Sequence, residues 1–238
     1  MKLTEPPLEI EYPESDGKPM GETDVHRSWL FRLIDMLAYR HRGQQVYVSG
    51  DLLVYYEEGR PQKFVVPDVF AVKDCDPRQR RIFKTWEEGR VPSVIFELTS
   101  ESTRREDAVF KPKTYARLRV PEYFLYDPTG EYLNPPLRGF RLIDDGYCPI
   151  EPDASGALVC EQLNVLLRLE SGQLCLFDRT TGDRLLTEGE AERAAREREQ
   201  RAREAEQRVR EQEHAARLAA EAEVERLRKL LEQRQDPS

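Results

Sequence analysis

Two carboxylates lie within otherwise apolar, β-rich runs of this sequence. Asp68 follows Val65-Val66-Pro67, and Glu97 follows Val94-Ile95-Phe96. A carboxylate inside an apolar strand is costly unless something compensates its charge. A hard divalent cation such as Mg²⁺ can compensate two at once, because it takes oxygen ligands, commonly one or two carboxylates with waters and a substrate phosphate. Asp68 and Glu97 are therefore candidate metal ligands.

A metal ion at these carboxylates would direct a particular chemistry. It would lower the pKa of a bound water and neutralise charge on a phosphodiester. Lys111 and Lys113 follow Glu97, on the helix expected after its strand. A lysine near the ion would orient the attacking water or stabilise developing negative charge. These residue types in this order suit the hydrolysis of a phosphodiester.

Each of these residues also has a structural interpretation. Asp68, directly after a proline, could cap a turn, and Glu97 could pair with Arg104 or Arg105. Lys111 could be an ordinary surface lysine. The residues alone leave both interpretations open.

Several neighbouring residues are better explained by folding than by chemistry. Asp107, at helical spacing before the first lysine, favours an ion pair. Tyr115 and Tyr123 are expected in the core. Asp51 and Asp127 stand next to strand ends, where turns favour aspartate.

Helix and strand patterns place the candidate residues on secondary structure. Apolar spacing predicts an amphipathic helix over about 24–41, capped by Thr23 or Asp24 and ended by Gly43. A second helix should run to about residue 119, either kinked at Pro112 or starting there. β-rich runs predict strands over 46–49, 52–56, 64–72, 91–98 and 122–126. Short β runs predict a hairpin-rich extension of the same domain over 130–187.

The C-terminal region has a different composition. Glu190–Arg234 contains neither proline nor glycine, which predicts a helix of about 45 residues. Its last part carries a plausible coiled-coil seam of Val224, Leu227, Leu230 and Leu231, whereas its alanine-rich first part is a poor one. A solvated single helix and a self-associating helix are both compatible with this pattern.

Composition excludes several classes of protein. The 238 residues carry 37 Lys+Arg against 45 Asp+Glu and include 4 cysteines and 3 histidines. No apolar run can span a bilayer, and acidic residues occupy the place of a secretory signal, so we expect a cytoplasmic protein without membrane association. The cysteines form no CxxC pair, which argues against a zinc knuckle. No glycine-rich phosphate motif is present, so no nucleotide cofactor is expected.

A nucleic-acid substrate needs a basic surface, whereas the net charge of this chain is −8. The acidic balance argues against broad, non-specific affinity for DNA. Two local basic walls are nevertheless possible, and each could also be a solvated face. They comprise Arg78, Arg80, Arg81 and Lys84, and Arg104, Arg105, Lys111, Lys113, Arg117 and Arg119.

The chain resembles a known family in five spaced segments. They are Pro67-Asp68, Trp86–Gly89, Glu97–Ser100, the run from Asp107 through Lys111 to Tyr115, and Pro121–Pro128. In this order they look like the Uma-type (Uma-two) family, a bacterial family of predicted endonucleases within the PD-(D/E)XK, or restriction-endonuclease-like, superfamily. The resemblance covers roughly residues 12–187.

The resemblance implies roles for individual residues. Asp68 and Glu97 match the two metal-binding acids, and the backbone carbonyl of Leu98 would complete the metal shell. The family pattern expects a lysine two residues after Glu97, where Thr99 stands; the resemblance implies that its role has moved to Lys111. Glu22 matches an accessory acid, and Arg119 stands where a glycine is more usual.

The combined prediction is an α/β protein with a restriction-endonuclease-like core, a mixed sheet flanked by helices, and a long C-terminal helix. Its parts are an irregular arm over 1–21, a nuclease-like domain over 22–187 and a charged helix over 188–238. The expected function is a Mg²⁺-dependent endonuclease acting on DNA, with Mn²⁺ as a possible substitute and a homodimer as the expected assembly. The alternative is a catalytically silent adaptor that oligomerises through its C-terminal helix.

Overall fold

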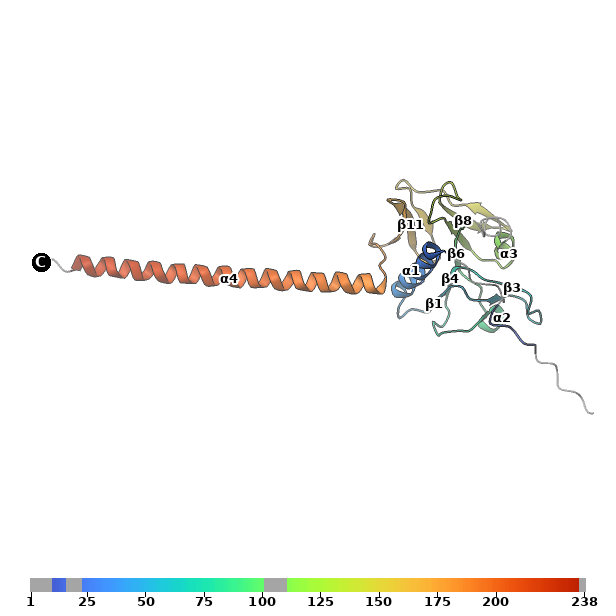
Figure 1. Cartoon of the computed structure of the whole chain (residues 1–238), viewed down its shortest axis with the longest axis horizontal. Helices are drawn as coiled ribbons and strands as arrows, with labels where there is room; N and C mark the ends of the chain where they lie inside the picture. Colours follow the sequence, from blue (N-terminus) through green and yellow to red (C-terminus); the bar gives the residue numbers. More distant parts are fainter. Residues whose placement is uncertain (1–9, 16–22, 101–110, 236–238) are drawn as a thin grey trace, which may run out of the picture. The chain divides into compact units, whose positions relative to one another are not determined.

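The structure is a computed structural model of the chain, and it describes residues 10–15, 23–100 and 111–235 (Figure 1). The chain divides into two compact units, Met1–Glu188 and Gly189–Ser238. All the described strands and the three shorter helices belong to the first unit, and one long helix makes up the second.

A six-stranded sheet forms the centre of the first unit, in the order β1-β4-β6-β7-β8-β9. The strands are β1 Val46–Ser49, β4 Val69–Lys73, β6 Val94–Leu98, β7 Glu122–Tyr126, β8 Leu137–Ile143 and β9 Gly146–Pro149. β6 and β7 run parallel, and the other neighbouring pairs are antiparallel. The predicted α/β class with a mixed sheet is therefore confirmed.

Successive side chains of a strand point to opposite faces of the sheet, so the core is divided between its two faces. On β4, Val69 belongs to one apolar cluster and Phe70 to the other. Helix α1, Asp24–Arg40, packs its leucines into the first cluster. Helix α3, Lys111–Arg117, contributes Tyr115 to the second. The two faces of the sheet are thus covered by different helices.

Helix α1 begins and ends close to the predicted positions. The Thr23 side chain accepts a hydrogen bond from the backbone N–H of His26 at 3.2 Å, as an N-cap does. The C-cap is His41, and Gly43 follows with a φ of 79°. The helix 24–41 expected from the apolar spacing is confirmed.

Two small sheets complete the first unit. One joins β10 Leu158–Cys160, β11 Val165–Glu170 and β12 Gln173–Asp178; the other joins β3 Phe64–Val65, β2 Val54–Tyr55 and β5 Phe83–Lys84. The first packs into the same apolar cluster as α1, and the second into the cluster of α3. A short helix, α2, covers Thr85–Glu88.

The expected single strand over 64–72 is wrong, because β3 and β4 are separate strands in different sheets. Pro67 has no N–H to donate, and the backbone N–H of Asp51 donates to the carbonyls of Pro67 (3.0 Å) and Asp68 (3.2 Å). The segment between β3 and β4 is therefore held by hydrogen bonds to the turn that contains Asp51. Strand β9 and helix α2 were not expected from the sequence. In the hairpin-rich extension predicted over 130–187, β8 and β9 join the main sheet and β10–β12 form a sheet of their own.

Helix α4, Glu188–Gln235, has 48 residues. Ion pairs at helical spacing run along it, including Arg203 with Glu199 and Arg210 with Glu206, each at 2.6 Å. Its side chains are exposed over most of the length for which they are described. Among the described residues, no helix is both long and apolar enough to cross a membrane.

Candidate active site

Strand pairing brings the two candidate acids together. Glu97 lies on the central strand β6 and is fully buried. The antiparallel register pairs Val69 with Phe96, so the next position along places Asp68 beside Glu97. The backbone N–H of Asp68 lies 3.4 Å from Oε2 of Glu97. Two residues separated by 29 positions therefore share one site.

Helix α3 supplies two donors to Glu97. The Lys111 Nζ donates to Oε2 at 2.8 Å, and the Tyr115 hydroxyl donates to Oε1 at 2.5 Å. Lys111 and Tyr115 are four residues apart, so they project from the same side of the helix. Burial, together with the charge of Glu97, raises the pKa of Tyr115 well above its ordinary value. The phenol therefore remains a donor over the usual pH range.

Asp68 is held from two other directions. The backbone N–H of Leu98 donates to Oδ2 at 2.6 Å, and Nε2 of His26 lies 3.4 Å from the same oxygen. Burial alone would raise the pKa of Asp68, but the His26 hydrogen bond, the Lys111 charge and the Leu98 N–H outweigh it and keep that pKa below its ordinary value. Asp68 is therefore a carboxylate at neutral pH.

The structure brings Asp68, Glu97 and Lys111 into one cluster. The Lys111 side chain is only 15% exposed and is paired, so it is not an ordinary surface lysine. Leu98 belongs to the same cluster through its backbone. Four further residues considered from the sequence lie outside the described part of the chain, namely Glu22, Arg104, Arg105 and Asp107.

Two members of the cluster were missed from the sequence. His26 was counted only as one of three histidines, although it lies four residues before Leu30 on the apolar side of α1. Tyr115 was expected to be a core residue, and it is fully buried, but its hydroxyl serves Glu97. Helical spacing from Lys111 was the available signal for Tyr115.

Thr99 occupies the position where the family pattern expects a lysine. It is buried, and its backbone N–H donates to the carbonyl of Tyr126 at 2.8 Å, within the sheet. A lysine ammonium nevertheless reaches the acid, because Lys111 approaches Glu97 from α3.

The donor chemistry of the cluster fits a hard divalent cation. Asp68 and Glu97 offer carboxylate oxygens, and Leu98 offers a backbone carbonyl oxygen, which are the ligands such ions prefer. In the described part of the chain, no three side chains of His, Cys, Asp or Glu converge as a preformed metal site. Both Glu97 oxygens instead accept hydrogen bonds from Lys111 and Tyr115. The Lys111 ammonium is thus the cation that neutralises Glu97 in this structure.

The first basic wall expected from the sequence is a network of ion pairs. The Arg80 guanidinium donates to both carboxylate oxygens of Glu88, at 2.7 and 2.8 Å, and lies 4.3 Å from the Tyr47 ring centroid. The other members are also paired: Arg78 with Glu88, Arg81 with Glu14, and Lys84 with Glu87. These charges are largely neutralised within the protein.

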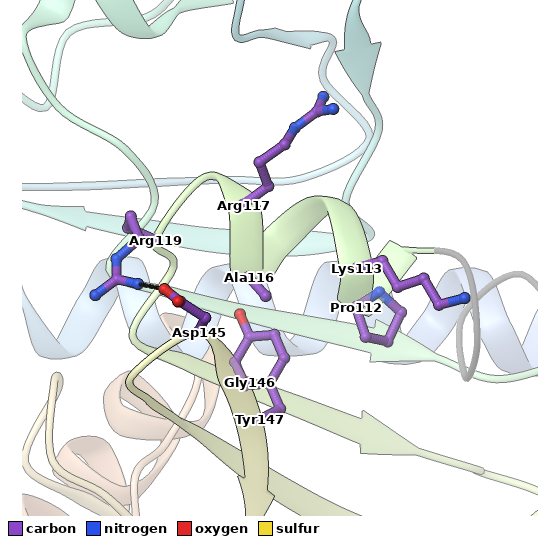
Figure 2. A pocket seen from close by; sticks show the side chains of 8 residues that line it. All are labelled: Pro112, Lys113, Ala116, Arg117, Arg119, Asp145, Gly146 and Tyr147. Carbon is purple, nitrogen blue, oxygen red and sulfur yellow. Dashed lines mark hydrogen bonds and ion pairs between the residues drawn. The ribbon is translucent and has the colours of Figure 1, made fainter.

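The second basic wall borders a cavity of about 550 Å³ beside α3. Lys113, Arg117 and Arg119 line it, with Tyr147 across from the helix (Figure 2). Arg119 is paired with Asp145 at 2.8 Å. Arg119 also has a φ of 62°, in the left-handed region where glycine is favoured, which explains why glycine is more usual there.

Comparison with known proteins identifies similar sequences and structures. A family model described as "Uma2: Putative restriction endonuclease" matches residues 2–170. Among solved structures, a "putative nuclease belonging to DUF820" from Anabaena variabilis ATCC 29413 aligns with a TM-score of 0.45 and 15% identity, over 61% of this chain and 76% of that chain. No curated protein matches the chain.

Proposed function

We propose that this chain is a metal-dependent endonuclease that hydrolyses phosphodiester bonds in DNA. It belongs to the Uma2 family, whose model is described as "Putative restriction endonuclease". Family membership supports the nuclease class. The metal ion, the DNA substrate and the roles of individual residues are our inference from the cluster around Glu97.

The observation that carries the proposal is the placement of Lys111. Its ammonium lies 2.8 Å from a fully buried glutamate that shares its site with a second carboxylate, Asp68. A buried ion pair is poor evidence for stability, because desolvation offsets much of the attraction. Two acids and a lysine drawn together from three elements are better explained by chemistry on an anionic substrate.

The roles follow from the donor types. Asp68, Glu97 and the Leu98 carbonyl would hold the ion, which when bound lowers the pKa of a water and offsets phosphate charge. Lys111 would orient the attacking water or stabilise negative charge developing on the phosphate. Tyr115 acts on Glu97 alone, since its hydroxyl fixes the orientation of that carboxylate through Oε1.

The cavity beside α3 supports an anionic polymer as the substrate. Its cations Lys113 and Arg117 follow Lys111 on the same short helix (Figure 2). Basic side chains that track a phosphate backbone provide most of the non-specific affinity of DNA-binding proteins. Lys113 and Arg117 are four residues apart and so project from the same side of this helix.

The alternative is a nuclease-like fold that binds a partner without cutting. The observation that favours it is that Lys111 and Tyr115 donate hydrogen bonds to both oxygens of Glu97. In that case Mg²⁺ and Mn²⁺ would give no Asp68-dependent stabilisation. Metal titration monitored by melting temperature separates the two functions.

We further infer that the two units have different roles, cleavage in the first and dimerisation in the second. Residues 22–187 would be the nuclease domain, and the region 188–238, through helix α4, would join two copies as a homodimer. Val224 and Leu227, each 49% exposed on α4, support this assembly because a second copy would cover them.

The test of function is plasmid cleavage by the full chain with Mg²⁺, with Mn²⁺ or with EDTA, beside Asp68→Asn. We expect metal-dependent cutting by the wild type and a loss of at least about a hundredfold in the variant. Asp74→Asn is a matched control, because Asp74 is exposed and outside the cluster. Equal cutting by wild type and Asp68→Asn would overturn the site assignment, and no cutting by the wild type would favour the silent binding protein.

A further inference from the structure

His26 lies where α1 meets the candidate metal ligands. Its side chain is 5% exposed, and Nε2 donates to the backbone carbonyl of Leu98 at 2.9 Å. The same nitrogen lies 3.4 Å from Oδ2 of Asp68. One imidazole nitrogen therefore contacts two of the three groups proposed to hold the ion.

Both separations from Nε2 suit neighbouring ligands of a single ion. Adjacent ligands of an octahedral ion with bonds of about 2.1 Å are about 3.0 Å apart. The Nε2–O separation of 2.9 Å and the Nε2–Oδ2 separation of 3.4 Å bracket that value. The same nitrogen faces both the Leu98 carbonyl and the Asp68 carboxylate, so an ion in the place of its proton would meet both oxygens.

We propose that His26 is a nitrogen ligand of the ion, so that the site combines imidazole with oxygen donors and favours Mn²⁺ over Mg²⁺. This inference rests on the proposed metal-dependent function. Imidazole is a borderline-soft donor that binds first-row transition ions, whereas Mg²⁺ is bound mostly by carboxylates, carbonyls and water. His26 thereby determines which metal the site selects.

Binding of an ion by His26 requires no net loss of a proton from the protein. In the present contact Nε2 carries the proton that it donates to Leu98. The other tautomer of neutral imidazole carries its proton on Nδ1 and leaves the Nε2 lone pair for an ion. The ion then takes the place of the proton between His26, Leu98 and Asp68, and no proton leaves the protein.

The position of His26 is fixed by the start of α1. Thr23 caps the helix through the His26 N–H, and Leu30 and Leu33 bury the following turns against the sheet. A ligand on a capped, packed helix costs little ordering free energy when it binds. Both His26 and Asp68 contact the backbone of Leu98, His26 at its carbonyl and Asp68 at its N–H, while Glu97 accepts from Lys111 and Tyr115.

The test is pulsed electron paramagnetic resonance of Mn²⁺ bound to the full chain, labelled with ¹⁵N at histidine. We expect hyperfine coupling from one histidine nitrogen in the wild type. His26→Asn should remove it, and Asp68→Asn should remove the bound ion. His214→Asn is the matched control, because this residue is exposed on α4 and its loss should leave the coupling unchanged.

Competition between the two ions gives an independent measurement. We expect the ratio of Mn²⁺ to Mg²⁺ affinity to fall at least about tenfold in His26→Asn. Mn²⁺ that binds in an Asp68-dependent manner without nitrogen coupling would overturn the inference and leave the metal-dependent function intact. Absence of any Asp68-dependent Mn²⁺ binding would overturn both. The wild-type spectrum decides the question even if His26→Asn does not fold.

Discussion

Buried carboxylates have two different uses in this molecule. Glu97 accepts hydrogen bonds from the side chains of Lys111 and Tyr115, and an ion or a substrate could replace these donors. Glu122, equally buried, accepts from Arg141 and from the backbone N–H groups of residues 161 and 162, which tie β7 to the neighbouring sheet. The backbone donors indicate a structural role for Glu122, whereas both side-chain donors of Glu97 come from α3, which is consistent with the chemical role proposed for Glu97.

Asp127 is a second structural carboxylate, and it predicts a pH dependence. Burial raises its pKa, but hydrogen bonds from Tyr132, Thr129 and Leu133 outweigh burial and lower it below the ordinary 3.8. The charged form therefore stabilises the fold above about pH 4, and this contribution is lost as the pH falls through the folded pKa.

We expect Asp127→Asn to reduce the free energy of unfolding by about 1–3 kcal/mol at pH 7. The difference from wild type should stay constant from pH 7 to 5 and shrink towards pH 3, measured by urea denaturation at each pH. Glu131→Gln provides a control at an exposed acid nearby. A difference that does not change down to pH 3 would contradict the assigned role.

Individual residues were predictable from the sequence to the extent that their context was local. Asp68 and Glu97 are conspicuous because apolar residues precede them, and Lys111 follows from the family resemblance and its helix. His26 is different, because its contact with Leu98 spans 72 positions and no local pattern reports it. Asp127 was correctly expected to serve a turn.

The element that places Asp68 is the break between β3 and β4. Gly50 packs against this break so closely that a Cβ there would lie 2.1 Å from the Asp68 carbonyl oxygen and 2.8 Å from Ile34 Cδ1. The neighbouring N–H of Asp51 bonds the same carbonyl. The turn at Gly50 therefore holds the backbone of the candidate ligand.

We expect Gly50→Ala to destabilise the protein by about 1–3 kcal/mol and to reduce cleavage by about a hundredfold, because the backbone of Asp68 must shift. The measurements are urea denaturation and plasmid cleavage. Gly189→Ala is the matched control, since a Cβ there meets nothing within 4 Å, the residue has no positive φ and it does not line the cavity beside α3. Equal effects of both substitutions would contradict this account.

Secondary structure was predictable where the pattern was long or strongly apolar. Helix α1, strands β1 and β7 and helix α4 lie close to their expected positions. Strand β9 escaped prediction because its residues are mostly exposed on a sheet edge and lack apolar alternation. Helix α3 is described from Lys111 onward and residues 101–110 lie outside the described part of the chain, so the choice between a kink at Pro112 and a start there stays a prediction.

On the scale of the whole molecule, helix α4 stands as a unit of its own. Its ion pairs support the helix only weakly, because exposed pairs at this spacing contribute about 0.3–0.5 kcal/mol each. Its exposed apolar residues include Val209, Leu218, Val224 and Leu227. These two features together favour a helix that gains further stability by association.

We expect the full chain to sediment as a dimer and Leu227→Glu to shift it to a monomer, because a charge within the seam would be buried without a partner. Analytical ultracentrifugation at several concentrations measures this. Ala202→Glu, in the alanine-rich part, should leave the dimer intact. A wild type that is monomeric at all concentrations would contradict the proposed role of α4.

The central claim is that the charges around Glu97 serve cleavage and not folding. The paired substitution Glu97→Gln with Lys111→Met tests it most directly, because it removes both charges while the glutamine carbonyl still accepts from Tyr115. Replacing a buried ion pair by neutral groups of similar size is often neutral or stabilising.

We therefore predict that the paired variant unfolds at the same urea concentration as wild type or a higher one, and that Mg²⁺-dependent plasmid cleavage falls by at least about a hundredfold. Cleavage at the wild-type rate by the folded variant would contradict the account.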